Sequence, residues 1–395
     1  MSLTESQVYM ADSKFIYVNT SKLYVDKTYK EIPSFKPVRK TRLFTDEKYD
    51  EIPGIGLYKK FSYYFGNNIV SIDRTNTIIT PFKTTLAPFL SMPEYEKQDL
   101  SYSECCDNRA KELLSFDKTL YVMYSGGIDS TTMLSALLNN STKNQQKKIN
   151  VLLSSESITN NQKFYDDIIC GNLNTIPSYD FDNYIGVDQD SIFVTAENND
   201  ELFGTNLVSF FIYRYDCDIL FEEPTVSNLF KVLEKKTIIS SEEDKEEMRK
   251  CIDLMLLLAE KSPVKLDTIY KLFWWLNFSL MWNVSYTRLL GFVKYKTYPE
   301  CNFHSFFSTK EFQLWSMNNV DNLIGSDWKT AKQHAKDYIN EYYKNDHYRV
   351  SAVPGSNLSN ICYNKPAPFA IGTDMIKWNI GDSIDHFIEP NNSFL

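Results

Sequence analysis

Residues 121–132 constrain the fold more than any other part of the chain, because they read as a strand, a tight turn and the start of a helix. The sequence there is YVMYSGGIDSTT, in which an apolar run precedes Ser125-Gly126-Gly127 and a second apolar run follows. The first N–H groups of a helix have no partner inside it, and its N-terminus carries partial positive charge. Glycine lets the backbone come close to an anion. The turn is therefore predicted to bind phosphate groups.

The spacing in this turn differs from that of two common phosphate-binding loops. The Walker A loop needs four residues between its glycines and then Lys with Ser or Thr, and the dinucleotide fingerprint needs G-x-G-x-x-G. Ser125, Ser130 and Thr131 add hydroxyl donors. Asp129 adds a carboxylate, which is compatible with a triphosphate when a cation such as Mg²⁺ bridges the two. An ordinary strand-turn-helix corner is the alternative interpretation.

A second segment of this kind follows about seventy residues later. Residues 191–204 read SIFVTAENNDELFG, again a strand, a polar turn and a helix start. Acidic residues are common at helix starts for electrostatic reasons, so this string alone is weak evidence. Its order and distance relative to the first loop make the pair informative.

Together the two segments resemble the synthetase domain of the asparagine synthetase family, a branch of the ATP pyrophosphatases. The first matches their S-G-G-x-D-S loop. The second falls without a gap on a family segment that reads approximately S-G-E-G-A-D-E-L-F-G-G-Y, and Asp200 to Gly204 match it outright. The pair separates this family from tRNA thiolases, lysidine synthetases, NAD synthetases and GMP synthetases. The resemblance covers roughly residues 116–210.

The resemblance implies a binding site for ATP and Mg²⁺. It places Asp129 and Asp200 on two sides of the metal, where carboxylates and phosphates supply the oxygen ligands that Mg²⁺ prefers. The remaining ATP and pyrophosphate ligands are expected among Ser125, Gly126, Gly127, Ser130, Thr131, Thr195 and Glu197. Val122, Leu152 or Leu153, at strand ends, is expected to pack against adenine. Two family glycines fall at Ala196 and Asn198, and because Asn tolerates left-handed angles, we expect a turn at Asn198-Asn199 to survive.

Three further residues are candidates for catalysis. The family has a stretch similar to E-x-R-V-P-F-L-D. The best match for its Glu is Glu300, which lies one residue from the aligned position. The alternative interpretation of Glu300 is a solvated carboxylate in a loop. The family also uses a late Lys to stabilise negative charge. The candidates are Lys329 and Lys365. Lys329 lies on a predicted helix, and its alternative interpretation is an ordinary exposed lysine. Lys365 lies in a loop flanked by prolines, from which a side chain can reach into a site.

The activity implied by the resemblance is ATP-dependent amide-bond formation. A carboxylate, aspartate or a similar acid, attacks the α-phosphate, pyrophosphate leaves, and ammonia or an amine attacks the acyl-adenylate. The chain begins Met1-Ser2-Leu3, without the Cys that releases ammonia from glutamine in family members. We therefore expect ammonia from solution or from a separate amidotransferase partner. Two alternative functions stay open: an ATP-dependent nucleobase or tRNA modification enzyme, and a non-catalytic nucleotide-binding protein. For the assembly, a homodimer stays open.

Hydrophobic periodicity predicts an α/β fold with a parallel sheet and nucleotide at the carboxyl ends of its strands. The predicted strands are 119–124, 149–155 and 191–195, and the predicted helices are 129–140, 160–171 and 200–213. From about residue 225 the pattern is mainly helical. Residues 1–115 are predicted to form a smaller β-rich domain, which is either a degenerate glutaminase-like domain or an unrelated cap. Residues 116–395 are predicted to form the synthetase domain.

Composition bears on partners and compartment. A net charge of −9 argues against a nucleic-acid surface. Seven cysteines without regular spacing and the lack of a signal peptide lead us to expect a reducing, cytoplasmic setting. The longest apolar stretch, residues 272–293, contains Asn277 and Arg288, so it is predicted to form buried helices and no membrane span.

Overall fold

The structure is a computed structural model that describes residues 15–18, 57, 61, 73–75, 77, 92–177, 190–205, 208, 217–235, 239–282, 303–324, 328–352 and 369–372. Its contacts divide the chain into two units. The sheet unit contains Pro93–Thr205 and Tyr295–Asn360, and the helical unit contains Met1–Met92, Asn206–Lys294 and Ile361–Leu395. Helix α4 (Tyr102–Ser115) belongs to the sheet unit.

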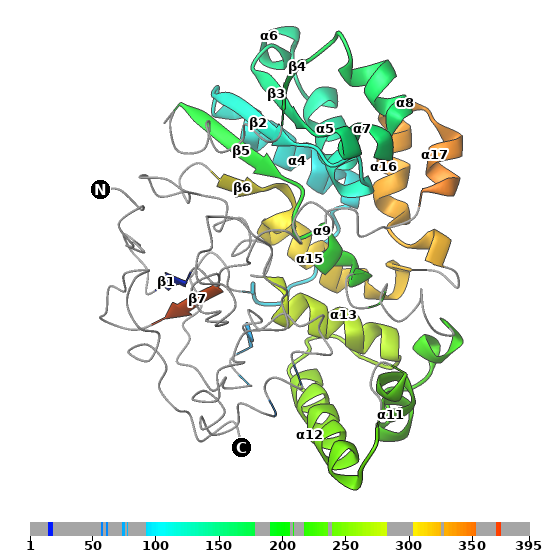
Figure 1. Ribbon diagram of the computed structural model, residues 1–395. Coiled ribbons are helices and arrows are strands. Elements are labelled where there is room, and N and C mark those ends of the chain that lie inside the picture. Colours follow the sequence, from blue (N-terminus) through cyan, green and yellow to red (C-terminus); the bar gives the residue numbers. More distant parts are fainter. Residues whose placement is uncertain are drawn as a thin grey trace, which may run out of the picture. The chain divides into compact units, whose positions relative to one another are not determined.

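The sheet unit is built on five parallel strands (Figure 1). Their spatial order is β4 (Asn174–Pro177), β3 (Ile149–Leu153), β2 (Thr119–Met123), β5 (Ser191–Thr195) and β6 (Phe303–Ser305). The predicted α/β fold with a parallel sheet is thus confirmed, and β2, β3 and β5 are the three predicted strands. Strand β5 is buried along its whole length, as expected for a sheet covered on both faces.

The order of the strands reverses between β2 and β5. From β2 the chain adds β3 and then β4 on one side, and β5 and β6 extend the sheet on the other side. Val122 lies opposite Val194, so the two strands end at the same level. In open α/β sheets such a reversal leaves a crevice outside the carboxyl ends of the strands, where ligands bind. The loops after β2 and β5 both start there.

Helix α5 (Ile128–Asn139) lies at the centre of this unit. Ten of its twelve residues are buried, serines and threonines among them, and it packs against α4 and α16 (Gln333–Tyr343) (Figure 1). The smaller helices are α6 (Lys143–Gln146), α7 (Ser155–Asn160), α8 (Gln162–Phe164), α9 (Asn199–Phe203), α15 (Lys310–Asn318) and α17 (Asp346–Ser351).

Two predicted helices differ from the observed ones. The helix expected over 160–171 is divided into α7, α8 and a π-helical turn (Tyr165–Ile169), because Asn161 leaves the helical conformation and its side chain caps a new start at Phe164. The helix expected over 200–213 is interrupted after Phe203. Gly204 there adopts a left-handed φ of +67°, which ends α9.

The helical unit contains α11 (Val226–Glu234), α12 (Glu242–Ala259) and α13 (Ile269–Leu280), as the predicted change to a helical pattern requires. Ser241 and Asp244 form the capping box of α12. Helix α13 is buried, and Trp275 Nε1 donates to the carbonyl of Leu258 on α12 at 2.7 Å. Of the described helices, none has the length and apolar character needed to cross a bilayer.

The described part of residues 1–115 does not support a β-rich domain. It includes one strand, β1 (Phe15–Val18), which pairs antiparallel with β7 (Phe369–Gly372), and the fourteen-residue helix α4. Most of residues 1–91 lie outside the described part of the chain.

Candidate functional site

The loop after β2 requires a glycine at its centre. Gly126 has a φ of +76°, and a Cβ atom added to it would lie 2.2 Å from the carbonyl oxygen of Ser157 and 2.7 Å from Cβ of Asn160. Asn160 also donates from Nδ2 to the carbonyl of Ser125 at 3.0 Å. Only glycine combines the left-handed angle with this close approach. Helix α7 (Ser155–Asn160) thereby fixes the conformation of the loop.

The serine hydroxyls of the loop bind one another and the loop backbone. Ser125 Oγ and Ser130 Oγ are 3.0 Å apart, the N–H of Ser125 donates to Ser130 Oγ at 3.1 Å, and Ser130 Oγ donates to the carbonyl of Gly127. Gly127, the N-cap residue of α5, provides no side-chain cap. The first N–H groups of this twelve-residue helix are therefore left without a capping oxygen, an arrangement that favours an anion.

The loop after β5 turns at Asn198, whose φ of +72° is the left-handed conformation expected there. The next residue, Asn199, connects three elements. Its Nδ2 donates to Asp129 Oδ1 at 2.6 Å, and its Oδ1 accepts from the hydroxyl of Tyr102 at 3.0 Å. Ser305, at the end of β6, donates to the carbonyl of Glu197 at 2.7 Å. Strand β6, α4 and α5 thus hold this loop in place.

Asp129 and Asp200 converge on the ammonium group of Lys332. The Nζ atom lies 2.7 Å from both carboxylate oxygens of Asp129 and 2.6 Å from Oδ1 of Asp200. Lys332 directly precedes α16, with a φ of +57°, and only 2% of its side chain is exposed. The Thr205 hydroxyl also donates to Asp200. We call Asp129, Lys332 and Asp200 the Asp-Lys-Asp centre.

Burial and the neighbouring charges together set the pKa values of this centre. Burial raises the pKa of Asp129 to about 6; Lys332 opposes this shift, and the neighbouring carboxylate of Asp200 adds to it. Burial by itself lowers the pKa of Lys332, but the two carboxylates outweigh it, so the pKa lies above its usual value. Lys332 is therefore a cation at neutral pH.

The donor set of the centre fits a magnesium ion. Two carboxylates face one point, and Mg²⁺ prefers such oxygen ligands together with phosphate or water. In the parts of the chain that the structure describes, no three His, Cys, Asp or Glu side chains are grouped for metal binding, so phosphate or water would have to complete the coordination. The ammonium group of Lys332 would have to move away from the carboxylates.

Another unsatisfied group lies at the end of β5. The hydroxyl of Thr195 is buried, and it has no hydrogen-bond partner among the residues that the structure describes. A buried polar atom without a partner is unfavourable, and a polar ligand would relieve it. Thr195 was predicted as an ATP ligand on the resemblance alone. Glu197, two residues later, is half-buried.

The other predicted site residues lie less favourably or are not described. Val122 and Leu152 are 0% and 2% exposed, so neither presents surface to an adenine ring in this structure. Lys329 is exposed on a short 3₁₀ turn, Trp328–Thr330. Glu300 and Lys365 lie outside the described residues.

Sequence reasoning missed Lys332, Asn199 and Tyr102. A signal for Lys332 was present: it lies three and seven residues before Ala335 and Ile339, both buried, so the helical spacing places a lysine on the apolar face of α16. The sequence carries no comparable signal for Asn199 or Tyr102. No family model, curated protein or solved structure matches the chain.

Proposed function

We propose that the chain is an ATP-dependent, AMP-forming amide ligase of the asparagine synthetase type. The observation that carries the proposal is the convergence of Asp129 and Asp200, from the loops after β2 and β5, on one cationic group beside the reversal of strand order. Carboxylates from the starts of α5 and α9, an uncapped helix N-terminus and a buried cationic side chain are the parts that phosphoryl chemistry needs.

Each part has a role in binding the triphosphate. The first N–H groups of α5 bind phosphate oxygens, and the Gly126 turn lets the nucleotide approach them. Mg²⁺ held by Asp129 and Asp200 would neutralise phosphate charge and polarise the α-phosphate. Lys332, released from the two carboxylates, turns its ammonium group to the charge that develops on the leaving pyrophosphate.

The substrates follow from the resemblance. The acid is a small carboxylate of the aspartate type, which attacks the α-phosphate and becomes an acyl-adenylate. Ammonia or an amine, from solution or from a separate amidotransferase, then attacks the acyl carbon and AMP leaves. Both steps develop charge beside Lys332, where a buried, permanently cationic group stabilises it.

Nucleotide product analysis tests the proposal. The purified chain is incubated with ATP, Mg²⁺ and a panel of amino-acid carboxylates, aspartate first, with and without ammonium. AMP and pyrophosphate that appear only with one acid support it, and ADP with phosphate overturns it. Asp129→Asn with Asp200→Asn should abolish AMP formation. The matched control is Asp117→Asn, an exposed acid paired with Lys148 before the amino end of β2, which should leave it unchanged.

A nucleotide-binding protein without turnover is the second candidate. The observation that favours it is the ammonium group of Lys332, which occupies the position between the carboxylates where a cation would bind. Titration of ATP with and without EDTA distinguishes the two functions. The ligase requires Mg²⁺ for tight ATP binding and forms AMP; the binding protein binds ATP equally well in EDTA and forms none.

A further inference from the structure

The ammonium group of Lys332 already occupies the point at which the two carboxylates of the Asp-Lys-Asp centre meet. Its Nζ atom lies 2.7 Å from both oxygens of Asp129 and 2.6 Å from Oδ1 of Asp200. A divalent cation at this point would share the same oxygen atoms with the ammonium group, and two cations at such short distances repel each other. Metal and ammonium group therefore compete for the centre.

The segment that carries Lys332 is held by its surroundings. Lys332 adopts a φ of +57°, a left-handed angle that a residue other than glycine keeps only where neighbouring structure imposes it. Four residues later, the side chain of Lys336 is buried on α16. Its ammonium group donates to the carbonyl of Lys329, at 2.5 Å, and to that of Ala352 at the end of α17, at 3.4 Å. The position of Lys332 is thus built into the fold.

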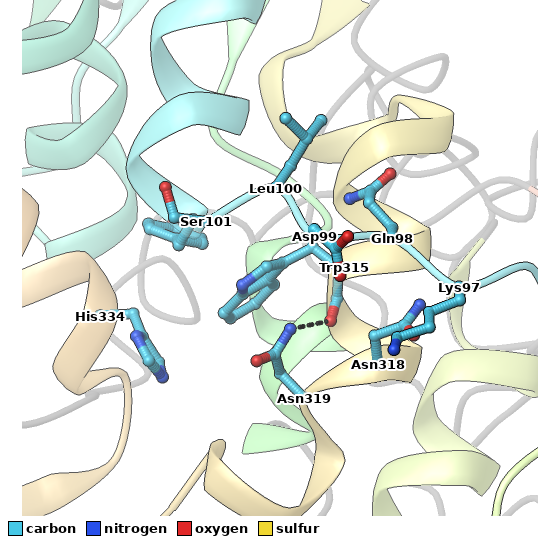
Figure 2. A pocket seen from close by; sticks show the side chains of 10 residues that line it. Lys97, Gln98, Asp99, Leu100, Ser101, Trp315, Asn318, Asn319 and His334 are labelled. Carbon is cyan, nitrogen blue, oxygen red and sulfur yellow. Dashed lines mark hydrogen bonds between the residues drawn. The ribbon is translucent and has the colours of Figure 1, made fainter.

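The carboxylates of the centre are accessible from solvent, and the lysine is not. The side chains of Asp129 and Asp200 are 22% and 37% exposed, against 2% for Lys332. An open pocket of about 420 Å³ reaches His334 on α16, but no residue of the centre lines it (Figure 2). A cation therefore meets the two acids first. If it displaced the ammonium group, Lys332 would lose both of its anions in a buried position, which is strongly unfavourable.

A phosphate group at the start of α5 would give the displaced ammonium group another anion. Asp129 is the second residue of this helix, so a phosphate bound to the uncapped N–H groups lies within about one helical turn, about 5 Å, of the carboxylate that Lys332 contacts. The flexible four-carbon stem of a lysine spans such a distance. With a polyphosphate bound, the metal can take the carboxylates while the ammonium group takes a phosphate oxygen, and every charge keeps a partner.

We propose that Lys332 is a resident counter-ion that keeps free divalent metal out of the centre, so that metal binds only together with a polyphosphate. The inference rests on the proposed function, from which it takes the metal and the triphosphate, and it adds how the binding of one controls the other. By linkage, the same coupling makes triphosphate binding depend on the metal. Without nucleotide, the centre stays in its closed, ion-paired state.

Titration of the full chain with Mn²⁺ in the absence of nucleotide, followed by the electron paramagnetic resonance signal of free Mn²⁺, tests the role of the lysine. The wild type should show no site tighter than about 1 mM. Lys332→Gln keeps a donor to the carboxylates but removes the charge, and it should bind one Mn²⁺ about tenfold or more tightly than the wild type, a usual size for coupling between two ligands. Lys332→Met should gain the same site, and adding Asp129→Asn to Lys332→Gln should remove it.

The matched control is Lys148→Met. It removes a lysine that lies 2.7 Å from the carboxylate of Asp117 on the surface, and it should gain no Mn²⁺ site. A wild-type site tighter than about 1 mM overturns the proposal. The absence of any gain in both Lys332 variants overturns it as well.

Melting temperatures of the wild type, at matched ionic strength, test the coupling without any substitution. Mg²⁺ alone should leave the melting temperature unchanged. Mg²⁺ with α,β-methylene ATP, which cannot be cleaved between these phosphates, should raise it above the value with the analogue and EDTA. A rise with Mg²⁺ alone overturns the proposal, and no rise with both ligands overturns it together with the nucleotide site. A rise with both ligands, but no AMP formed from ATP, overturns the ligase and leaves the role of Lys332 standing.

Discussion

The ammonium group of Lys332 lies 2.7 Å from each carboxylate oxygen of Asp129, although 203 residues separate the two in the sequence. The contact joins the start of α5 to the start of α16. Because Asp200 binds the same ammonium group from the loop after β5, one side chain connects three elements at the carboxyl edge of the sheet. The lysine is therefore expected to matter for folding as well as for any ligand that replaces it.

Lys332→Met should destabilise the protein. The change removes the buried cation and leaves two partly exposed carboxylates facing each other. Losing one partner of a buried ion pair costs about 3 kcal/mol or more. Urea unfolding, followed by circular dichroism in metal-free buffer, measures the effect. Lys329→Met is the matched control, because Lys329 is exposed three residues earlier, and should change stability by less than about 0.5 kcal/mol. Equal effects of the two substitutions would contradict the role of Lys332.

Asp129 should give stability an unusual dependence on pH. In the folded state its pKa is raised to about 6, whereas an unfolded Asp titrates near about 3.9. The folded state therefore holds the proton over this interval, and the contribution of Asp129 to stability is lost as pH rises from about 4 to about 6. Relative to Asp129→Asn, the wild type should lose about 2 to 3 kcal/mol across this interval.

Urea unfolding of both proteins at successive pH values, in metal-free buffer, provides this comparison. Other carboxylates titrate in both proteins, so the difference between the two curves isolates Asp129. A difference that stays constant, or one that grows in favour of the wild type as pH rises, would show that the pKa is not raised.

Local pattern was sufficient to predict the strands that position the site. Strands β2, β3 and β5 are short apolar runs bounded by polar turns, and such runs form buried parallel strands. The left-handed turn at Asn198 followed from the residue type. Strand β4 was not predicted because it is a largely exposed edge strand of four residues, NTIP, without an apolar run. Strand β6 has three residues, too few to give a periodic signal.

The missing members of the site depend on long-range packing. The sequence places Lys332 near a helix start, but nothing local states that this helix packs on α5. Asn199 follows Asn198, which the resemblance aligns with a family glycine. The two hydrogen-bond partners of the Asn199 side chain, Tyr102 and Asp129, lie on α4 and α5. The resemblance indicated Asp129 and Asp200, the two acids that face the ammonium group. That this group belongs to Lys332 followed only from the folded chain.

Gly126→Ala should damage both the fold and the predicted phosphate loop. The added methyl group meets the backbone of Ser157 and the side chain of Asn160, and it also disfavours the φ of +76°, for a total cost of about 3 kcal/mol. Gly171→Ala is the matched control, since its φ is +74° but nothing lies within 4 Å of the added atom. It should cost about 1 kcal/mol from the backbone angle alone. Thermal unfolding of both variants measures the difference, and equal losses would exclude the close contact at Gly126.

Tyr102→Phe should isolate the hydrogen bond between α4 and the second loop. Burial holds the pKa of Tyr102 well above its usual value, so the hydroxyl stays protonated and donates to Asn199. Its removal leaves the Oδ1 atom of Asn199 buried without that donor, which costs about 1 to 2 kcal/mol. The matched control is Tyr95→Phe, where an exposed hydroxyl donates to Asn318 at 3.3 Å and little change is expected. Urea unfolding compares the two variants. A loss for Tyr102→Phe no larger than that for Tyr95→Phe would mean that water or another donor replaces the tyrosine hydroxyl at Asn199.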